Sequence, residues 1–203
     1  MNNTNPNIIV STITPSFRMK RYLKLFLEEL PKQTYFDKME VVLDHNEPDE
    51  EEIAWVKEFQ AKYPGRIKHI ITNPVAPIGT SMNTCIREAS GKYLTIWNVD
   101  DLRTPNSIEL QVRAIEEKNA DIAFGDYLIV RKFAPAGTIA TGKWVRHRDI
   151  PESEYTRGMI FGPFLMFKKS LTERAGIFDE QLVSGADFDL SVRLAFNGKA
   201  VVA

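Results

Sequence analysis

The sequence predicts a single α/β domain in which a mostly parallel sheet is covered by helices on both faces, with a small antiparallel part. The 203 residues suit one domain. Apolar residues make up 43% of the chain and charged residues 26%, which is ordinary for a globular protein. Short apolar runs alternate with segments of helical periodicity, and this order is typical of parallel strands connected by helices.

The first half of the chain predicts four strands, each followed by a helix. The strands are short apolar or β-branched runs, and the helices repeat apolar residues at helical spacing. An acidic first turn after Asp49 and a cap formed by Thr104 and Pro105 mark two of the helix starts. The expected strands cover residues 8–13, 40–43, 67–71 and 93–97, and the expected helices cover 22–30, 49–63, 79–90 and 104–118.

The second half is less regular and predicts shorter elements. Residues 127–133 and 143–145 are expected to pair as antiparallel strands, and 134–155 form a candidate lid beside an acceptor. The other expected strands cover 121–124, 163–168 and 199–203. A short helix is expected to start at Ser170, and another helix is expected to cover 187–196. Because the last strand is only begun, we expect the natural protein to continue beyond Ala203.

Charge and cysteine content exclude several classes of protein. The net charge of -1 gives no cationic excess, so we expect no nucleic-acid partner. The single cysteine, Cys85, excludes an internal disulfide framework and a thiolate zinc cluster. The polar start is no signal peptide, and no apolar run approaches the ~18 residues of a membrane span. We expect a cytoplasmic location, with a peripheral position at the inner membrane face as the alternative.

Polar residues follow three of the predicted strands at the edge where open α/β sheets bind ligands. These are Thr14, Pro15 and Ser16 after the first strand, Asp44 after the second, and Asn98, Asp100 and Asp101 after the fourth. Crowded carboxylates repel one another unless a cation neutralises them, and oxygen-rich sites of this kind suit Mg²⁺ or Mn²⁺. The alternative is that these residues form turns and helix caps, where Asp and Asn are common.

Five segments together resemble the family-2 glycosyltransferases, in the expected order along nearly the whole chain. Ile9–Ser16 is similar to the first strand of that family, and Val41–Asp49 to its second strand and Asp-rich turn. Gly91–Asp101 resembles the strand that carries the Asp-x-Asp metal motif. Gly162–Phe167 with Ala175–Glu180 resembles the acceptor-side strand and the Gly-x-Phe-Asp turn that follows it, and Gly185–Leu194 resembles the helix start that carries the catalytic acid.

The resemblance implies a GT-A fold and an inverting transfer of sugar from a UDP-, GDP- or TDP-sugar to a glycan, lipid-linked or protein acceptor. Residues 1–101 would be the nucleotide-binding half and 102–203 the acceptor-side half. By position, Thr14, Pro15 and Ser16 would contact the nucleotide, Asp44 its base, and Asn98 the ribose. Asp100, with Asp101 beside it, would hold Mn²⁺ or Mg²⁺, and Asp187 would be the general base.

Elementary chemistry agrees with these implied roles, although some positions depart from the family pattern. A cation offsets the charge of a departing diphosphate, and one carboxylate base suffices for attack from the opposite face. Asn98 and Ala186 stand where the family often has acids, and Asn46 with Glu47 replaces Gly-Ser. Asp187 also suits the first turn of a helix for electrostatic reasons alone, and Asp189 is expected to pair with Arg193.

Two other functions remain open at this point. A nucleotidyltransferase also pairs a Rossmann-like half with a metal held by carboxylates, but residues 11–18 contain no glycine for its usual phosphate loop. A binding module that keeps the fold without turnover is the third possibility. Exchange of Asp187 for Asn separates the three, because a transferase that depends on this base loses transfer and keeps donor binding.

Overall fold

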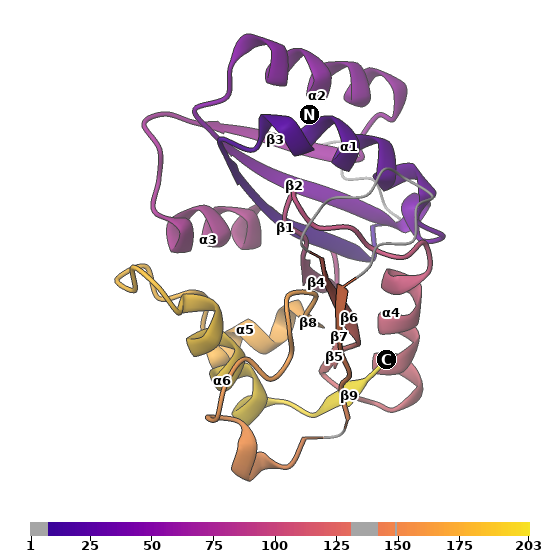
Figure 1. The fold of residues 1–203 in the computed structure, drawn as a ribbon, viewed down its shortest axis with the longest axis vertical. Helices are drawn as coiled ribbons and strands as arrows, with labels where there is room; N and C mark the ends of the chain where they lie inside the picture. Colours follow the sequence, from indigo (N-terminus) through magenta and orange to yellow (C-terminus); the bar gives the residue numbers. More distant parts are fainter. Residues whose placement is uncertain (1–7, 131–141, 149) are drawn as a thin grey trace.

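The computed structural model describes residues 8–130, 142–148 and 150–203. A seven-stranded sheet with the order β3-β2-β1-β4-β8-β5-β9 runs through these residues, and a separate two-stranded sheet pairs β6 with β7 (Figure 1). The strands are β1 Val10–Phe17, β2 Met39–Asn46, β3 Ile67–Thr72, β4 Tyr93–Ile96, β5 Ile122–Phe124, β6 Tyr127–Val130, β7 Gly142–Val145, β8 Met166–Lys168 and β9 Ala200–Val202.

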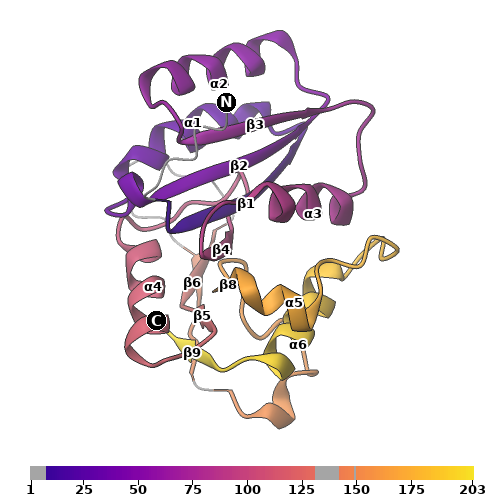
Figure 2. The same cartoon turned by 180° about the vertical axis from the view of Figure 1, so that it is seen from behind.

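Helices on both faces of the sheet enclose two hydrophobic cores. They are α1 Lys20–Glu29, α2 Glu50–Lys62, α3 Ile78–Glu88, α4 Ser107–Glu117, α5 Thr172–Ala175 and α6 Ala186–Asn197. Helices α1, α2 and α4 pack on one face, and α3, α5 and α6 on the other (Figures 1 and 2). In β2, Val41 and Leu43 enter the first core while Val42 enters the second, as expected for a strand buried on both faces. Among the described residues, no helix is long and apolar enough to cross a membrane.

The sheet is mostly parallel, as the sequence predicts, with one reversal. β1 pairs in parallel with β2 and β4, β2 with β3, and β5 with β9. β8 runs antiparallel to both of its neighbours, β4 and β5. The β6–β7 hairpin confirms the predicted antiparallel pair, whereas residues 134–141 and 149 of the candidate lid lie outside the described residues.

Two strands extend further than the sequence predicts, because polar residues at their ends pair within the sheet. Thr14, Pro15 and Ser16 were expected to end β1, but they continue it in register with Leu43–His45 of β2. Pro15 has no N–H to donate, yet this costs no ladder bond because β4 has ended on that side after the Ile13–Ile96 pair. Thr14, Pro15 and Ser16 therefore lie within the sheet, at the carboxyl end of β1.

The start of α4 differs from its predicted cap at Thr104 and Pro105. The helix begins at Ser107, and Asn106 in the N-cap position makes no side-chain cap bond. The carbonyl of Thr104 accepts a hydrogen bond from Gln33 at 3.1 Å, and that of Pro105 accepts one from the N–H of Thr34 at 2.8 Å. Because their carbonyls bond to Gln33 and Thr34, which follow α1, Thr104 and Pro105 are not part of the helix.

Candidate active site

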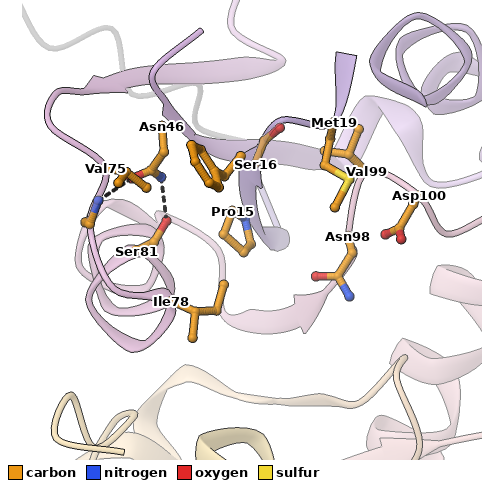
Figure 3. A pocket seen from close by; sticks show the side chains of 12 residues that line it. Pro15, Ser16, Met19, Asn46, Val75, Ile78, Ser81, Asn98, Val99 and Asp100 are labelled. Atoms are coloured by element: carbon orange, nitrogen blue, oxygen red, sulfur yellow. Dashed lines mark hydrogen bonds between the residues drawn. The ribbon is translucent and has the colours of Figure 1, made fainter. Parts of the chain in front are cut away.

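A cleft of about 450 Å³ opens at the carboxyl ends of β1, β2 and β4. In Figure 3, Pro15 and Ser16 lie in its middle, Asn46 and Ser81 on one side, and Asn98 and Asp100 on the other. Val75 and Ala76 of the β3–α3 connection, together with Ile78 at the start of α3, complete the rim. The sheet edge predicted to bind a ligand is therefore hollowed, and the predicted residues Pro15, Ser16, Asn98 and Asp100 meet there, whereas Thr14, Asp44 and Asp101 do not line the cleft.

The end of β1 supplies the centre of the cleft. Pro15 and Ser16 line it, whereas Thr14 is fully buried below them, with its hydroxyl 2.8 Å from that of Thr12. Ser16 is only 2% exposed, and its Oγ has no hydrogen-bond partner among the described residues. A buried hydroxyl without a partner at a cleft wall is a candidate to bind a polar ligand.

Asp44 lies beneath the cleft wall rather than in it. It is fully buried and accepts hydrogen bonds from Thr72 Oγ1 at 2.6 Å, from Asn46 Nδ2 at 3.2 Å and from Ser81 Oγ. Asn46 and Ser81 line the cleft, and Asn46 Oδ1 accepts the N–H of Ala76 at 2.8 Å. The carboxylate thus fixes two side chains of the wall, while its own oxygens are occupied.

Sequence reasoning did not assign Ser81 to the site, although a signal for it exists. Ser81 precedes Cys85 by four positions on α3, so the two side chains share the inward face of that helix. A polar residue near the N-terminal end of an inward face, next to a sheet edge that binds ligands, is a candidate wall residue.

The acidic loop after β4 forms the opposite side of the cleft. Asn98 and Asp100 line it, and Asp101 lies behind them, accepting a hydrogen bond from Asn98 Nδ2 at 3.2 Å. The loop is closed by Trp97 Nε1, which donates to the carbonyl of Asp101 at 3.0 Å, and by the Asp101 N–H, which donates to the carbonyl of Asn98 at 3.1 Å. Burial, and then the charge of Asp100, raise the pKa of Asp101.

The donor atoms of this loop fit a hard divalent cation that shares its ligands with a substrate. The described residues contain no group of three or more His, Cys, Asp or Glu side chains that could hold a metal ion. Two carboxylates and one amide oxygen are therefore what the loop offers. Mg²⁺ characteristically binds with one or two carboxylates and completes its coordination with phosphate oxygens and water.

Asp187 lies in the first turn of α6, on the face of the sheet that α3 also covers. Its side chain is exposed, is not part of the cleft wall, and accepts the N–H of Phe188 at 2.8 Å. Asp189 pairs with Arg193 at 2.6 Å, as the spacing predicts. Arg193 also donates to the carbonyls of Ala175 and Ile177, so this pair anchors the turn before α6.

A polar contact that sequence reasoning missed joins the segment before α6 to α3. Glu180 accepts hydrogen bonds from Thr80 at 2.8 Å and Asn83 at 2.8 Å, and it pairs with Arg87 at 3.1 Å. These hydrogen bonds hold the pKa of Glu180 below its usual range. The helix that lines the cleft and the turn that leads to Asp187 are therefore held together.

Relatives of known family match most of the chain. A curated relative, an uncharacterized glycosyltransferase of Methanocaldococcus jannaschii, is 26% identical over 93% of this chain and 65% of its own length. The Escherichia coli enzyme UDP-Glc:alpha-D-GlcNAc-diphosphoundecaprenol beta-1,3-glucosyltransferase WfgD is 28% identical over 70% of this chain and 54% of its own. The chain thus spans less than two thirds of either relative.

Solved structures share the fold at low identity. Staphylococcus aureus TarS, residues 1–349 in complex with UDP-GlcNAc, matches with a TM-score of 0.73 and 18% identity over 97% of this chain and 56% of its own. The mannosyltransferase PcManGT of Pyrobaculum calidifontis, in complex with GDP-Man and Mn²⁺, matches with a TM-score of 0.70 and 18% identity over 96% and 54%. These neighbours support the GT-A fold expected from the sequence.

The family model described as glycosyl transferase family 2 matches residues 11–175, which include the cleft, its acidic loop and the reversed strand β8. This match covers well over half of the chain, and we conclude that the chain belongs to glycosyl transferase family 2.

Proposed function

We propose that this chain transfers a sugar from a nucleoside-diphosphate donor to an acceptor hydroxyl, with inversion, in polysaccharide or glycoconjugate biosynthesis. The observation that carries the proposal is the cleft at the carboxyl edge of the sheet, in which Asn98 and Asp100 lie across from Asn46 and Ser81. Family membership supports the class of reaction. The cytoplasmic location expected from the sequence is part of the proposal.

The nucleoside occupies the side of the cleft formed by Pro15, Ser16 and Asn46. The partnerless Ser16 hydroxyl supplies a hydrogen bond there, and Thr14 supports the strand below it. Asp44 acts through Asn46 and Ser81, whose positions it fixes, and therefore favours one arrangement of polar atoms toward the base. UDP-GlcNAc in TarS and GDP-Man in PcManGT make a UDP- or GDP-sugar the first donors to test.

The diphosphate extends toward Asn98 and Asp100. Asn98 suits a ribose hydroxyl, because its amide oxygen accepts a hydrogen bond without adding charge. Asp100 and Asp101 would hold Mn²⁺ or Mg²⁺, which neutralises the charge of the leaving diphosphate. The Mn²⁺ complex of PcManGT supports this choice of cation.

Asp187 accepts the proton of the acceptor hydroxyl as that oxygen attacks the anomeric carbon. Its exposed carboxylate is open to an approaching acceptor, and the hydrogen bond from Phe188 leaves it acceptor capacity. Attack from the face opposite the diphosphate inverts the anomeric centre. The acceptor is a glycan, a lipid-linked sugar or a protein, and the diphosphoundecaprenol-linked acceptor of WfgD makes a lipid-linked sugar the first to test.

A nucleotide screen followed by a transfer assay tests this proposal. Thermal unfolding is measured with UDP, GDP, TDP and CDP, each with Mn²⁺ and with chelator. At about 100 times the dissociation constant, a bound nucleotide adds about 2.7 kcal/mol of stability, and we expect this for one nucleotide in Mn²⁺. Absence of stabilisation by all four contradicts the proposal. Binding without transfer to any acceptor class would instead favour a non-catalytic binding module. Release of pyrophosphate from a nucleoside triphosphate would favour a nucleotidyltransferase.

A further inference from the structure

Arg103 is a buried cation directly behind the acidic loop. Its side chain is 7% exposed and lies between the loop and the start of α4. Nη2 donates to Thr95 Oγ1 at 2.6 Å and to the carbonyl of Ile96 at 2.9 Å, and Nη1 donates to Gln111 Oε1 at 2.9 Å. The planar guanidinium therefore connects the end of β4 to α4 across the base of the loop.

Two aromatic rings complete the surroundings of this guanidinium. Its Cζ lies 4.8 Å from the ring centroid of Phe164 and 5.4 Å from that of Trp97. Among the described residues Arg103 forms no ion pair, and Asp101 is the acid whose charge acts on it. Burial lowers the pKa of Arg103 to about 9, so it remains cationic at neutral pH. Burying a charge without an ion-pair partner costs free energy that an apolar side chain would avoid.

The contacts of Arg103 define both ends of the acidic loop. Ile96 directly precedes the loop and Arg103 follows it. The Arg103 side chain donates a hydrogen bond to the Ile96 carbonyl. Trp97, which stacks on Arg103, donates its indole N–H to the carbonyl of Asp101. Gln111, which binds Arg103, also donates to the carbonyl of Phe164. Movement of the guanidinium would therefore displace the backbone that carries Asp100 and Asp101.

We propose that Arg103 is a positioning residue, which fixes the Asn98–Asp101 loop in the geometry that binds a divalent cation together with the donor diphosphate. The proposal rests on the proposed function, because that function assigns the cation to this loop. Arg103 touches neither substrate nor metal. It acts through the loop backbone, and its fork of donors is what a lysine at this position could not reproduce.

Three variants test this role. R103K keeps the positive charge but loses the planar set of guanidinium donors. R103M keeps the aliphatic part of the side chain but loses both the charge and the donors. E40Q is the control. Glu40 is also buried, at 2% exposure, and accepts hydrogen bonds from Ser11 and from the N–H of Ser90 at the opposite end of the same sheet. For each protein, the melting temperature and the Mn²⁺ concentration that half-saturates UDP or GDP binding are measured, by thermal unfolding and titration calorimetry.

We expect R103K to raise the half-saturating Mn²⁺ concentration about 10- to 100-fold, as loss of residues that orient metal ligands typically does. R103M should raise it at least as much. E40Q should lower the melting temperature and leave the Mn²⁺ requirement unchanged, because it disturbs the sheet far from the loop. Nucleotide binding in chelator should be the same in all proteins, since the nucleoside side of the cleft is intact.

The outcomes separate this inference from the proposed function. If R103K folds and its Mn²⁺ requirement equals that of E40Q, the positioning role is wrong while the proposed function stands. R103K decides this even where R103M fails to fold, because lysine preserves the charge in the same space. If the unaltered protein binds none of UDP, GDP, TDP and CDP in Mn²⁺, the proposed function and the role of Arg103 are overturned together.

Discussion

Asn83 on α3 and Phe178 in the turn before α6 exchange two hydrogen bonds across 95 positions of sequence. Asn83 Nδ2 donates to the Phe178 carbonyl at 2.9 Å, and the Phe178 N–H donates to Asn83 Oδ1 at 2.9 Å. The amide side chain thus binds the turn as a neighbouring strand would. Since α3 lines the cleft and the turn leads to Asp187, this pair fixes the cleft wall relative to the start of α6.

Replacing Asn83 with Ala should lower the free energy of unfolding by about 2–4 kcal/mol, because the two hydrogen bonds to Phe178 and the one to Glu180 are lost and buried backbone groups are left unpaired. Urea unfolding measures this change. The matched control is Thr84→Ala, which removes a hydroxyl that donates to Thr80 within the same helix, and we expect it to change stability by no more than about 0.5 kcal/mol. Equal losses in the two variants would contradict the bridging role of Asn83.

Exchanging Asp100 for Ala should weaken nucleotide binding in Mn²⁺ by at least about tenfold, or about 1.4 kcal/mol, and leave binding in chelator unchanged. The reason is that Asp100 lines the cleft and supplies one of only two carboxylates that the acidic loop offers. Titration calorimetry with and without chelator measures both affinities. Glu117→Ala is the control, because this exposed acid pairs with Arg113 on the outside of α4. A Mn²⁺ effect that survives Asp100→Ala would move the cation elsewhere.

Replacing Asp187 with Asn should reduce the rate of sugar transfer by about 10²- to 10⁴-fold, the typical contribution of a general base. Donor affinity should be unchanged, because Asp187 is not part of the cleft wall. The comparison variant is Asp189→Asn, at a position two residues after Asp187 on the same helix. This variant breaks the ion pair between Asp189 and Arg193. We expect this second variant to lose stability and retain transfer. Near-normal transfer by Asp187→Asn would assign the base to another residue.

Acid should destabilise the protein through a pair of histidines behind the cleft. His45 Nδ1 lies 3.2 Å from His69 Nε2, and Glu52 Oε1 lies 3.4 Å from His45 Nε2. Burial, followed by the charges of His45 and Lys57, lowers the pKa of His69 to about 4, and burial also lowers that of His45. Because the unfolded state binds these protons more readily, the stability contribution is complete above about pH 6.5 and is lost as the pH falls toward 4.

Exchange of His69 for Gln tests this pH dependence. His69 is partly exposed, so solvent screening should limit its contribution to about 1–2 kcal/mol over this interval. Unfolding in urea is followed between pH 4 and 7 for both proteins. Carboxylates that titrate in the same interval affect both curves equally, so the difference between the curves isolates the histidine. Parallel curves would show that His69 binds protons equally well in the folded and unfolded states.

The periodicity of the sequence was sufficient to predict the strands and helices, but not the partners of polar residues. Runs of apolar and β-branched residues located β1 to β5, although β1 and β2 extend further than the runs indicate. The sequence pattern places Thr14 and Asp44 after their strands, since nothing local indicates that Thr72 and Ser81 satisfy Asp44 within the fold. For the same reason the sequence does not predict the role of Arg103, because its partners lie in β4, in α4 and in the segment before β8.

The reversed direction of β8 has a consequence for how this scaffold can diversify. Because β8 is antiparallel to β4, its first residues arrive where β4 finishes, and the N–H of Ile96 donates to the carbonyl of Leu165 at 3.2 Å. The polypeptide ahead of Phe164 therefore reaches the sheet at the end of β4, which is the edge at which the cleft opens, without belonging to the sheet. Lengthening or rewriting that stretch would change the surface beside the cleft while the parallel strands β1, β2 and β4 keep their register, so the two can evolve independently.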